Sequence, residues 1–212
     1  VYGPLINGAT TVMFEGVPNW PDSSRFWQIV DKHAINIFYT APTAIRALMA
    51  QGNSYVNSTS RKSLRVLGTV GEPINPEAWE WYYRTVGEQR CPIVDTWWQT
   101  ETGWSISANC MGLGMLPVKA GSPTKPAPGW HLEVLDENCN PVANGEVGAL
   151  CGKLPMPPGS MLTLWNAPER FVESYFAEFP GYYKTADAGF IDDDGYVFVT
   201  VSYTHLRAHE TR

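Results

Sequence analysis

The sequence has no long apolar run, no cluster of basic residues and no closely spaced pair of cysteines. A membrane-spanning helix needs about 20 apolar residues, so neither a transmembrane segment nor a membrane partner is expected. Fifteen Lys and Arg against 21 Asp and Glu give a net charge of −6, which disfavours binding to a nucleic-acid backbone. The widely spaced cysteines, Cys91, Cys110, Cys139 and Cys151, predict neither a disulfide scaffold nor a zinc site, and they fit a reducing compartment.

Three further features are missing. No G-x-G-x-x-G follows a predicted strand, which argues against a dinucleotide oxidoreductase. The pair His205 and His209 lacks the Glu of an H-E-x-x-H metal motif, so we interpret it as part of a solvated tail. The chain also has no initiating Met and no signal-like segment, and residues 201–212 do not continue the preceding pattern. We therefore expect a fragment with a foreign tail, located in the cytoplasm or, as the alternative, in an organelle lumen.

The first half of the chain alternates strand-like and helix-like segments. Short β-branched and aromatic runs predict strands, and amphipathic stretches with N-terminal Pro or Asp and Ser predict helices. The predicted strands are residues 10–14, 35–40, 64–70 and 91–96, and the predicted helices are 22–33, 42–49 and 76–86. Repeated strand–helix units of this length predict the α/β class, with a mostly parallel sheet covered by helices.

The second half has Pro and Gly at close intervals, which is typical of a β-rich unit. Short strands are predicted at 131–135 and 147–151, a helix at 168–176 and a hairpin-like close at 182–199. We expect an α/β subdomain at 1–110, a small β-rich subdomain at 111–200, and the tail at 201–212. Loops from both subdomains are expected to face one cleft.

Two predicted strand ends carry candidate ligand-binding residues. Ligands of parallel sheets bind at the carboxyl ends of the strands. Gly71-Glu72-Pro73 lets the backbone approach a ligand closely. In Thr96 to Gly103, Thr100 and Glu101 suit a magnesium-bound triphosphate, while the paired tryptophans are either rigid pocket walls or buried core residues.

Asp187 and Asn19 are weaker candidates. The Asp187 carboxylate is suited to accept two hydrogen bonds from a ribose diol, but a plain turn residue is the alternative. Asn19, between Pro18 and Trp20, is likewise open to interpretation as a turn residue.

Four blocks of sequence, residues 1–21, 39–48, 70–81 and 95–103, together resemble the acetyl-CoA synthetase family of acyl-adenylate-forming ligases. The resemblance covers about residues 1–200. It implies that acetate attacks the α-phosphorus of MgATP to give acetyl-AMP and pyrophosphate, after which the thiol of coenzyme A displaces AMP. The implied partners are the small molecules acetate, ATP and coenzyme A, with Mg²⁺ as cofactor; the oligomeric state is not predicted.

The resemblance also implies roles for individual residues. The ATP/AMP site is implied to comprise the adenine-side loop Gly71, Glu72 and Pro73, the strand end Asp95, Thr96, Trp97, Trp98, Gln99 and Thr100, and the ribose-binding Asp187. Glu101 is the implied Mg²⁺ ligand and Asn19 a coenzyme A contact. Val70 and Trp98 are implied to form the acyl pocket, where a Trp closes the pocket against acids longer than about two or three carbons.

The sequence departs from the family pattern at several places. Ala186 replaces a glycine in the ribose motif, and it is strained by roughly 1 kcal/mol if its φ is positive. The family's ATP-contacting Arg and catalytic Lys belong to a C-terminal domain that the tail does not match, so no catalytic residue is expected in this chain. We expect the full-length parent to be the enzyme and the isolated fragment to be inactive.

Two alternatives remain open from the sequence. One is a propionyl-CoA or other short-chain acyl-CoA synthetase. The other, from a different class, is a non-catalytic Trp-rich binding module, which predicts exposed, coplanar indoles. The ligase hypothesis instead predicts that Trp97 and Trp98 lie beside a cleft shared with Gly71 and Asp187.

Overall fold

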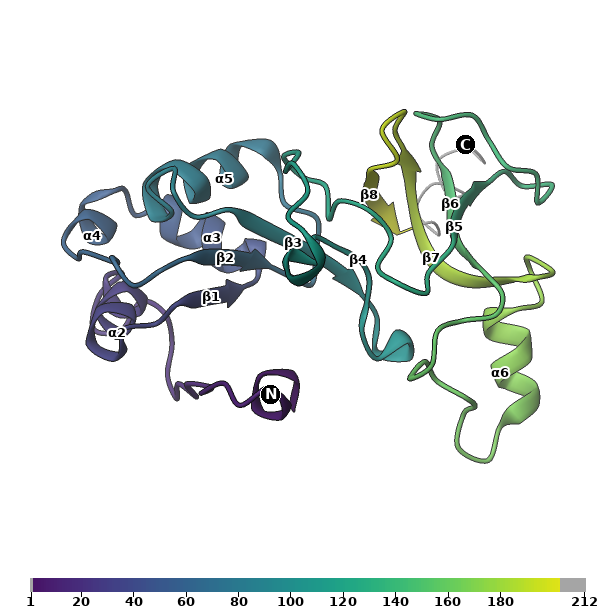
Figure 1. The fold of residues 1–212 in the computed structure, drawn as a ribbon, viewed down its shortest axis with the longest axis horizontal. Helices are drawn as coiled ribbons and strands as arrows, with labels where there is room; N and C mark the ends of the chain where they lie inside the picture. Colours follow the sequence, from purple (N-terminus) through teal and green to yellow (C-terminus); the bar gives the residue numbers. More distant parts are fainter. Residues whose placement is uncertain (1, 203–212) are drawn as a thin grey trace.

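The computed structural model describes residues 2–202, which form two four-stranded sheets that follow one another along the chain (Figure 1). The helices are α1 (Tyr2–Ile6), α2 (Arg25–His33), α3 (Pro42–Met49), α4 (Ser54–Asn57), α5 (Pro76–Trp81) and α6 (Pro168–Tyr175). The strands are β1 (Ile37–Thr40), β2 (Val66–Thr69), β3 (Ile93–Trp98), β4 (Ser105–Ala108), β5 (Leu132–Leu135), β6 (Gly148–Lys153), β7 (Tyr182–Ile191) and β8 (Val197–Ser202).

The first sheet has the strand order β1-β2-β3-β4, and its first three strands are parallel. Helix α3 lies in the crossover from β1 to β2, and α5 lies in the crossover from β2 to β3. Thr40 pairs with Thr69 and Thr69 pairs with Asp95, so the carboxyl ends of the three strands meet at one edge. This edge is where a ligand site is expected in such a sheet.

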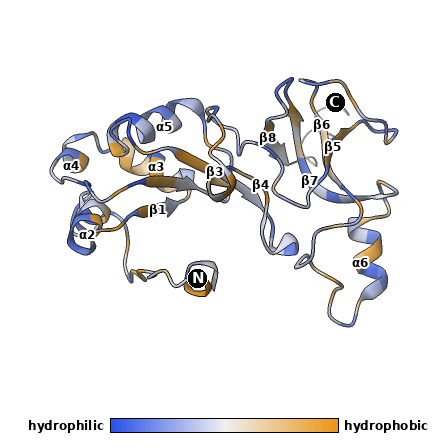
Figure 2. Cartoon of the chain, viewed as in Figure 1, coloured by the Kyte–Doolittle hydropathy of each residue, from blue (hydrophilic) through white to orange (hydrophobic). Residues whose placement is uncertain are grey.

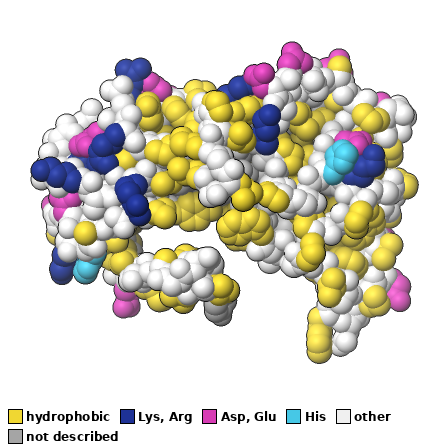
Figure 3. All heavy atoms as spheres, in the orientation of Figure 1, with side chains coloured by type: hydrophobic (Ala, Val, Ile, Leu, Met, Phe, Trp, Pro, Cys, Tyr) yellow, Lys and Arg dark blue, Asp and Glu magenta, His cyan; other side chains and the backbone are white. Residues whose placement is uncertain are grey.

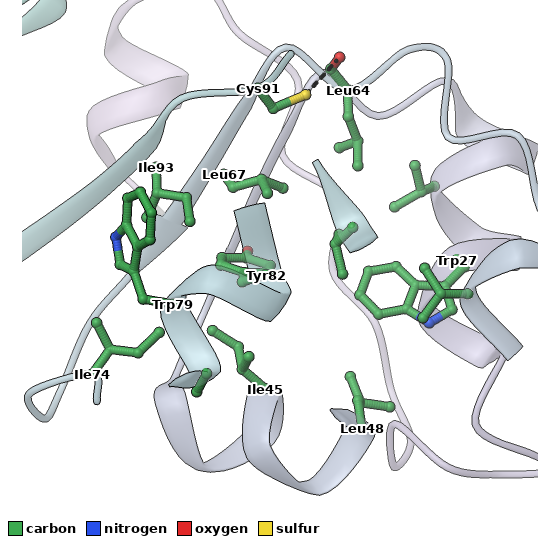
Figure 4. Packing of buried hydrophobic residues seen from close by; sticks show 14 residues of the cluster. Trp27, Ile45, Leu48, Leu64, Leu67, Ile74, Trp79, Tyr82, Cys91 and Ile93 are labelled. Carbon is green, nitrogen blue, oxygen red and sulfur yellow. Dashed lines mark hydrogen bonds between the residues drawn. The ribbon is translucent and has the colours of Figure 1, made fainter. Parts of the chain in front are cut away.

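The main core lies between this sheet and its helices (Figure 4). Pro42 and Pro76 begin α3 and α5, where the missing proline N–H costs no hydrogen bond. Ile45 of α3, Leu67 of β2 and Tyr82 at the end of α5 are almost completely buried, each contributing about 1.5–3 kcal/mol. A π-helical turn at Tyr82–Val86 ends the predicted helix 76–86 and places Tyr82 under the sheet, where its hydroxyl donates to the Gly68 carbonyl.

The other face of β1 and β2 is much less covered. Ile37 and Tyr39 are 61% and 49% exposed. Figure 2 nevertheless colours much of β1, β2 and β3 as hydrophobic. In Figure 3 hydrophobic side chains gather over the same strands, with charged side chains mostly around them. None of the helices in residues 2–202 combines the length and the apolar character needed to span a bilayer.

The second sheet is antiparallel, in the order β5-β6-β7-β8, and confirms the strands predicted at 131–135, 147–151 and 182–199. Helix α6 confirms the prediction at 168–176 and packs beside β7. Between β6 and β7 the register shifts from Ala149 opposite Ala188 to Cys151 opposite Lys184. This bulge lies in the segment that carries Asp187, and bulges of this kind redirect side chains.

Two sequence-based predictions are wrong. Residues 10–14 are not a buried strand: they pair with no strand among residues 2–202, and Met13 is 83% exposed. The apolar run alone is insufficient, because a strand also needs a neighbour for its backbone hydrogen bonds. Trp97 and Trp98 do not lie in a loop; they extend β3, because β4, which was not predicted, pairs with them.

The predicted tail at 201–212, including His205 and His209, lies outside the described residues apart from the last two residues of β8. The subdomain boundary at residue 110 stays a prediction. It falls between the two observed sheets, after β4 and before β5.

Candidate functional site

A cavity of about 250 Å³ opens at the carboxyl edge of β2 and β3 and is also bounded by the second sheet. Most of the residues predicted for nucleotide binding line it: Gly71, Glu72, Pro73, Asp95, Thr96, Trp97, Trp98, Gln99 and Asp187. The sequence separations are large, since Trp97 and Asp187 are 90 residues apart. The structure therefore brings residues of both sheets to one cleft.

Asp187 is held in place by two side chains of the β3 end. Trp97 Nε1 donates to Asp187 Oδ2 at 2.9 Å, and Gln99 Nε2 donates to the same oxygen at 3.0 Å. Burial raises the pKa of Asp187, and these two hydrogen bonds oppose that rise. The carboxylate is thus oriented and partly desolvated, as a group that binds hydroxyls requires.

The residue before it, Ala186, has a φ of 60°, in the left-handed region. This is the conformation in which a Cβ crowds the following carbonyl oxygen and costs about 1–2 kcal/mol. The structure thus gives Ala186 the positive φ on which its expected strain depends. Ala186 lies within the β7 bulge, next to the Asp187 carboxylate that accepts from Trp97.

Ala186→Gly is expected to stabilise the chain, because glycine adopts a positive φ without the Cβ contact. The expected gain of about 1 kcal/mol corresponds to a rise in Tm of about 2–4 °C. Ala188→Gly is the matched control in the same strand: Ala188 is fully buried and lacks a positive φ, so its loss should lower Tm. A lower Tm for Ala186→Gly in thermal unfolding would contradict the strain.

Asp95 lies deep in the cavity wall. The Thr69 hydroxyl donates to Asp95 Oδ1, and the indole N–H of the buried Trp79 also interacts with the carboxylate. Burial raises the pKa of Asp95 to about 6, against the lowering effect of the hydrogen bonds from Thr69 and Trp79.

The raised pKa of Asp95 predicts that stability depends on pH. A carboxyl that holds its proton more tightly in the folded state stabilises that state at low pH. This stabilisation is lost as the pH rises from the ordinary value of 3.8 through about 6, and it amounts to at most about 3 kcal/mol. Urea unfolding of the wild type and of Asp95→Asn should diverge between pH 4 and pH 7, with the variant favoured at pH 7. Parallel pH profiles would contradict this prediction.

The loop after β2 has an unusual backbone. Gly71 has a φ of 97°, which explains a glycine there, and no atom lies within 4 Å of the position its Cβ would occupy. Glu72 forms an ion pair with Arg46 of α3 at 2.9 Å, and both side chains are about one third exposed. A pair this exposed contributes little to stability, so it serves mainly to orient the loop.

The two tryptophans of β3 point in different directions, as expected for successive strand residues. Trp97 is 9% exposed and belongs to the core of the second sheet, whereas Trp98 is 44% exposed and lines the cavity. Thr96 donates to the Thr69 carbonyl at 2.8 Å and shares a hydrogen bond of 2.6 Å with the Tyr39 hydroxyl. Trp97 is therefore a core residue that reaches the cavity, and Trp98 is a more exposed part of the cavity wall.

Four predicted site residues do not line this cavity. Val70 is half-buried and continues the β2 ladder, with its N–H bonded to the Thr40 carbonyl. Thr100 and Glu101 lie in a 3₁₀ turn after β3, where the Glu101 carboxylate accepts from Tyr175 at 2.9 Å. Asn19 is exposed ahead of α2. These four residues lie outside the cavity lining, and their roles stay predictions.

Sequence reasoning missed other residues of the wall: Thr69, Ile74, Gly121, Pro123 and Val199. Ser122 donates to the Val197 carbonyl at 2.6 Å, which fixes the Gly121–Pro123 segment against β8. Gly121-Ser122-Pro123 was visible only as a turn signal. Its role in the wall depends on a contact between residues 75 apart in the sequence.

The described residues contain no group of three or more His, Cys, Asp or Glu side chains that could hold a metal ion. Mg²⁺ is commonly bound through one or two carboxylates together with substrate phosphates, so the single Glu101 carboxylate fits this kind of site. Tyr175 already orients one of its oxygens.

The AMP-binding enzyme family matches residues 1–161, and the chain belongs to this family. It is 56% identical over 200 residues to an acetyl-coenzyme A synthetase of Magnetococcus marinus and 58% identical over 205 residues to one of Methylocella silvestris. These alignments cover 94% of this chain but only 31% and 30% of the relatives, so the chain spans less than a third of their length.

A solved structure shares the fold. The anthranilate CoA ligase in complex with anthranoyl-AMP aligns with a TM-score of 0.77 over 93% of this chain and 35% of the ligase, at 24% sequence identity. The α/β architecture predicted from the sequence is thus confirmed, and the anthranilate CoA ligase shares this fold.

Proposed function

We propose that this chain is the central part of an acetyl-CoA synthetase and forms most of its adenosine site. One observation carries the proposal: Gly71, Trp98 and Asp187, from separate parts of the chain, line a single cavity at the carboxyl edge of the parallel sheet. The names of the relatives and the family match support the same assignment.

The proposed reaction has two balanced steps. A carboxylate oxygen of acetate bonds to the α-phosphorus of ATP and pyrophosphate leaves, giving acetyl-AMP. The coenzyme A thiol then gives up its proton to solvent, its sulfur bonds to the acetyl carbon, and AMP leaves with the phosphate oxygen as the carbon–oxygen bond breaks. Catalysis of this kind consists mainly of positioning and charge stabilisation, and Mg²⁺ when bound neutralises phosphate charge.

Different residues of the chain would position the different parts of the substrates. Gly71, Glu72 and Pro73 line the adenine side of the cavity, with Asp95 in its wall. Asp187 accepts hydrogen bonds from the ribose hydroxyls, and Trp98 limits the chain length of the carboxylic acid substrate. For the residues that do not line the cavity, we propose Val70 beside Trp98 in the acyl pocket, Thr100 at the triphosphate, Glu101 at Mg²⁺ and Asn19 at coenzyme A.

The chain also has exposed tryptophans, as a Trp-rich binding module would. Trp20, Trp104 and Trp165 are 72%, 66% and 91% exposed. Trp97, by contrast, is buried and donates its indole N–H to Asp187, an arrangement that serves a polar site in a cleft. We therefore favour the nucleotide site.

Calorimetric titration of this chain with AMP tests the proposal. We expect saturable binding at one site, without turnover of acetate and ATP by the isolated chain. A titration without binding heat at several temperatures would contradict the proposed adenosine site. The small-molecule partners and the cytoplasmic location remain predictions.

A further inference from the structure

The side chain of Gln99 uses both of its N–H donors within the protein. Nε2 donates to the Thr185 carbonyl at 2.6 Å and to Asp187 Oδ2 at 3.0 Å, and Oε1 accepts from the Tyr183 hydroxyl at 2.6 Å. A primary amide has two N–H donors, so Gln99 has none left for a ligand although it lines the cavity. Its role therefore lies in what it does to Asp187.

Tyr183 determines which end of the Gln99 amide faces Asp187. The reversed amide would place Oε1 against the Thr185 carbonyl and the Asp187 carboxylate. Both of these groups are acceptors, so Oε1 could not form a hydrogen bond with either. The Tyr183 hydroxyl supplies the donor that Oε1 needs in the observed orientation. Tyr183 is 1% exposed, and burial raises its pKa, so the hydroxyl keeps its proton at physiological pH.

Tyr183 is itself held rigidly between elements of the second half of the chain. Its ring stacks on Tyr175 of α6, with centroids 5.9 Å apart and planes at 19°, and it also contacts Trp130 at 6.2 Å. The hydroxyl position is thus set by packing rather than by solvent.

The consequence for Asp187 is an asymmetric carboxylate. Trp97 and Gln99 both donate to Oδ2, whereas Oδ1 has no hydrogen-bond partner among residues 2–202. Two donors on one oxygen fix the rotation of the carboxylate and leave the other oxygen for hydroxyls of a ligand in the cavity.

We propose that Tyr183 and Gln99 are positioning residues that orient Asp187 to receive a vicinal diol, and that they thereby set the preference of this site for ribose over 2′-deoxyribose. The inference rests on the proposed adenosine site. It adds a residue, Tyr183, that touches no ligand and acts through Gln99.

The test compares the Kd of AMP with the Kd of 2′-deoxyAMP, measured by calorimetry on the whole 212-residue chain. Tyr183→Phe keeps the ring packing but removes the hydroxyl that donates to Gln99 Oε1, which loosens the orientation of the amide. Gln99→Met removes the amide. Tyr182→Phe is the matched control, because the neighbouring hydroxyl donates to Glu133 outside the cavity.

For the wild type and Tyr182→Phe we expect AMP to bind about tenfold more tightly than 2′-deoxyAMP, as the loss of one hydrogen bond to a charged group implies. In Tyr183→Phe and Gln99→Met this ratio should fall to below about threefold, chiefly through weaker AMP binding. A purely structural role would weaken both nucleotides equally.

A wild-type ratio retained in both variants would overturn the inference and leave the adenosine site standing. Absence of AMP binding by the wild type would overturn the proposed function, and the inference with it. Where Tyr183→Phe does not fold, Gln99→Met decides the question, because Gln99 is only half-buried.

Discussion

Replacing Asp187 with alanine is expected to weaken AMP binding by about a hundredfold, the equivalent of two charge-assisted hydrogen bonds to the ribose. The structure gives Asp187 two fixed donors on Oδ2 and a place in the cavity wall, so its other oxygen is prepared for a ligand. Calorimetric titration with AMP measures the effect directly.

Asp136→Ala is the control for this prediction. Asp136 is likewise a hydrogen-bonded carboxylate, accepting from the backbone N–H groups of Asn138 and Asn140, but it lies outside the cavity. Its loss should leave the Kd of AMP unchanged. Because Asp187→Ala deprives Trp97 and Gln99 of an acceptor, thermal unfolding must show that the variant is folded; a folded variant with wild-type affinity would refute the assigned role.

Replacing Trp98 with glycine should change acid selection in a full-length protein that contains this segment. Trp98 lines the cavity and is 44% exposed, so its removal opens space without disturbing the buried Trp97. Each methylene accommodated in an apolar pocket is worth about 1–3 kcal/mol, so kcat/KM for a four- or five-carbon acid relative to acetate should rise by about a hundredfold or more.

Trp104→Gly provides the comparison, since Trp104 is 66% exposed and does not line the cavity. It should leave the ratio of kcat/KM values as in the wild type. The wild-type ratio of acetate to propionate distinguishes an acetyl-CoA synthetase from a propionyl-CoA synthetase. An unchanged preference in Trp98→Gly would remove Trp98 from the acyl pocket.

The sequence was sufficient for α2, α3, α5 and the parallel strands because their apolar residues recur at the spacing of buried faces, but it did not predict the short helices α1 and α4. Ile45 and Leu48 indicated the buried side of α3, and the apolar run at residues 64–70 indicated β2. Residues 10–14 have an equally apolar run, yet they form no strand, because strand formation depends on a partner that local composition does not reveal.

The site was predictable as a set of residues but not as a geometry. Composition and family resemblance suggested Trp97, Gln99 and Asp187, but not that the first two both donate to one oxygen of the third. That arrangement depends on the bulge in β7 and on the positive φ of Ala186. Tyr183 gave no sequence signal, because a buried tyrosine in a strand is indistinguishable there from ordinary core.

The central claim is that AMP binds in the cleft between the β3 end and β7. The most direct measurement is the ¹H–¹⁵N spectrum of the nine tryptophan indole N–H groups during titration with AMP, with the Trp97 signal assigned through Trp97→Phe. We predict that the Trp97 signal shifts in a saturable way, because its N–H is bonded to Asp187, while that of the exposed Trp165 does not. A shift confined to exposed indoles such as Trp165, with Trp97 unchanged, would contradict the claim.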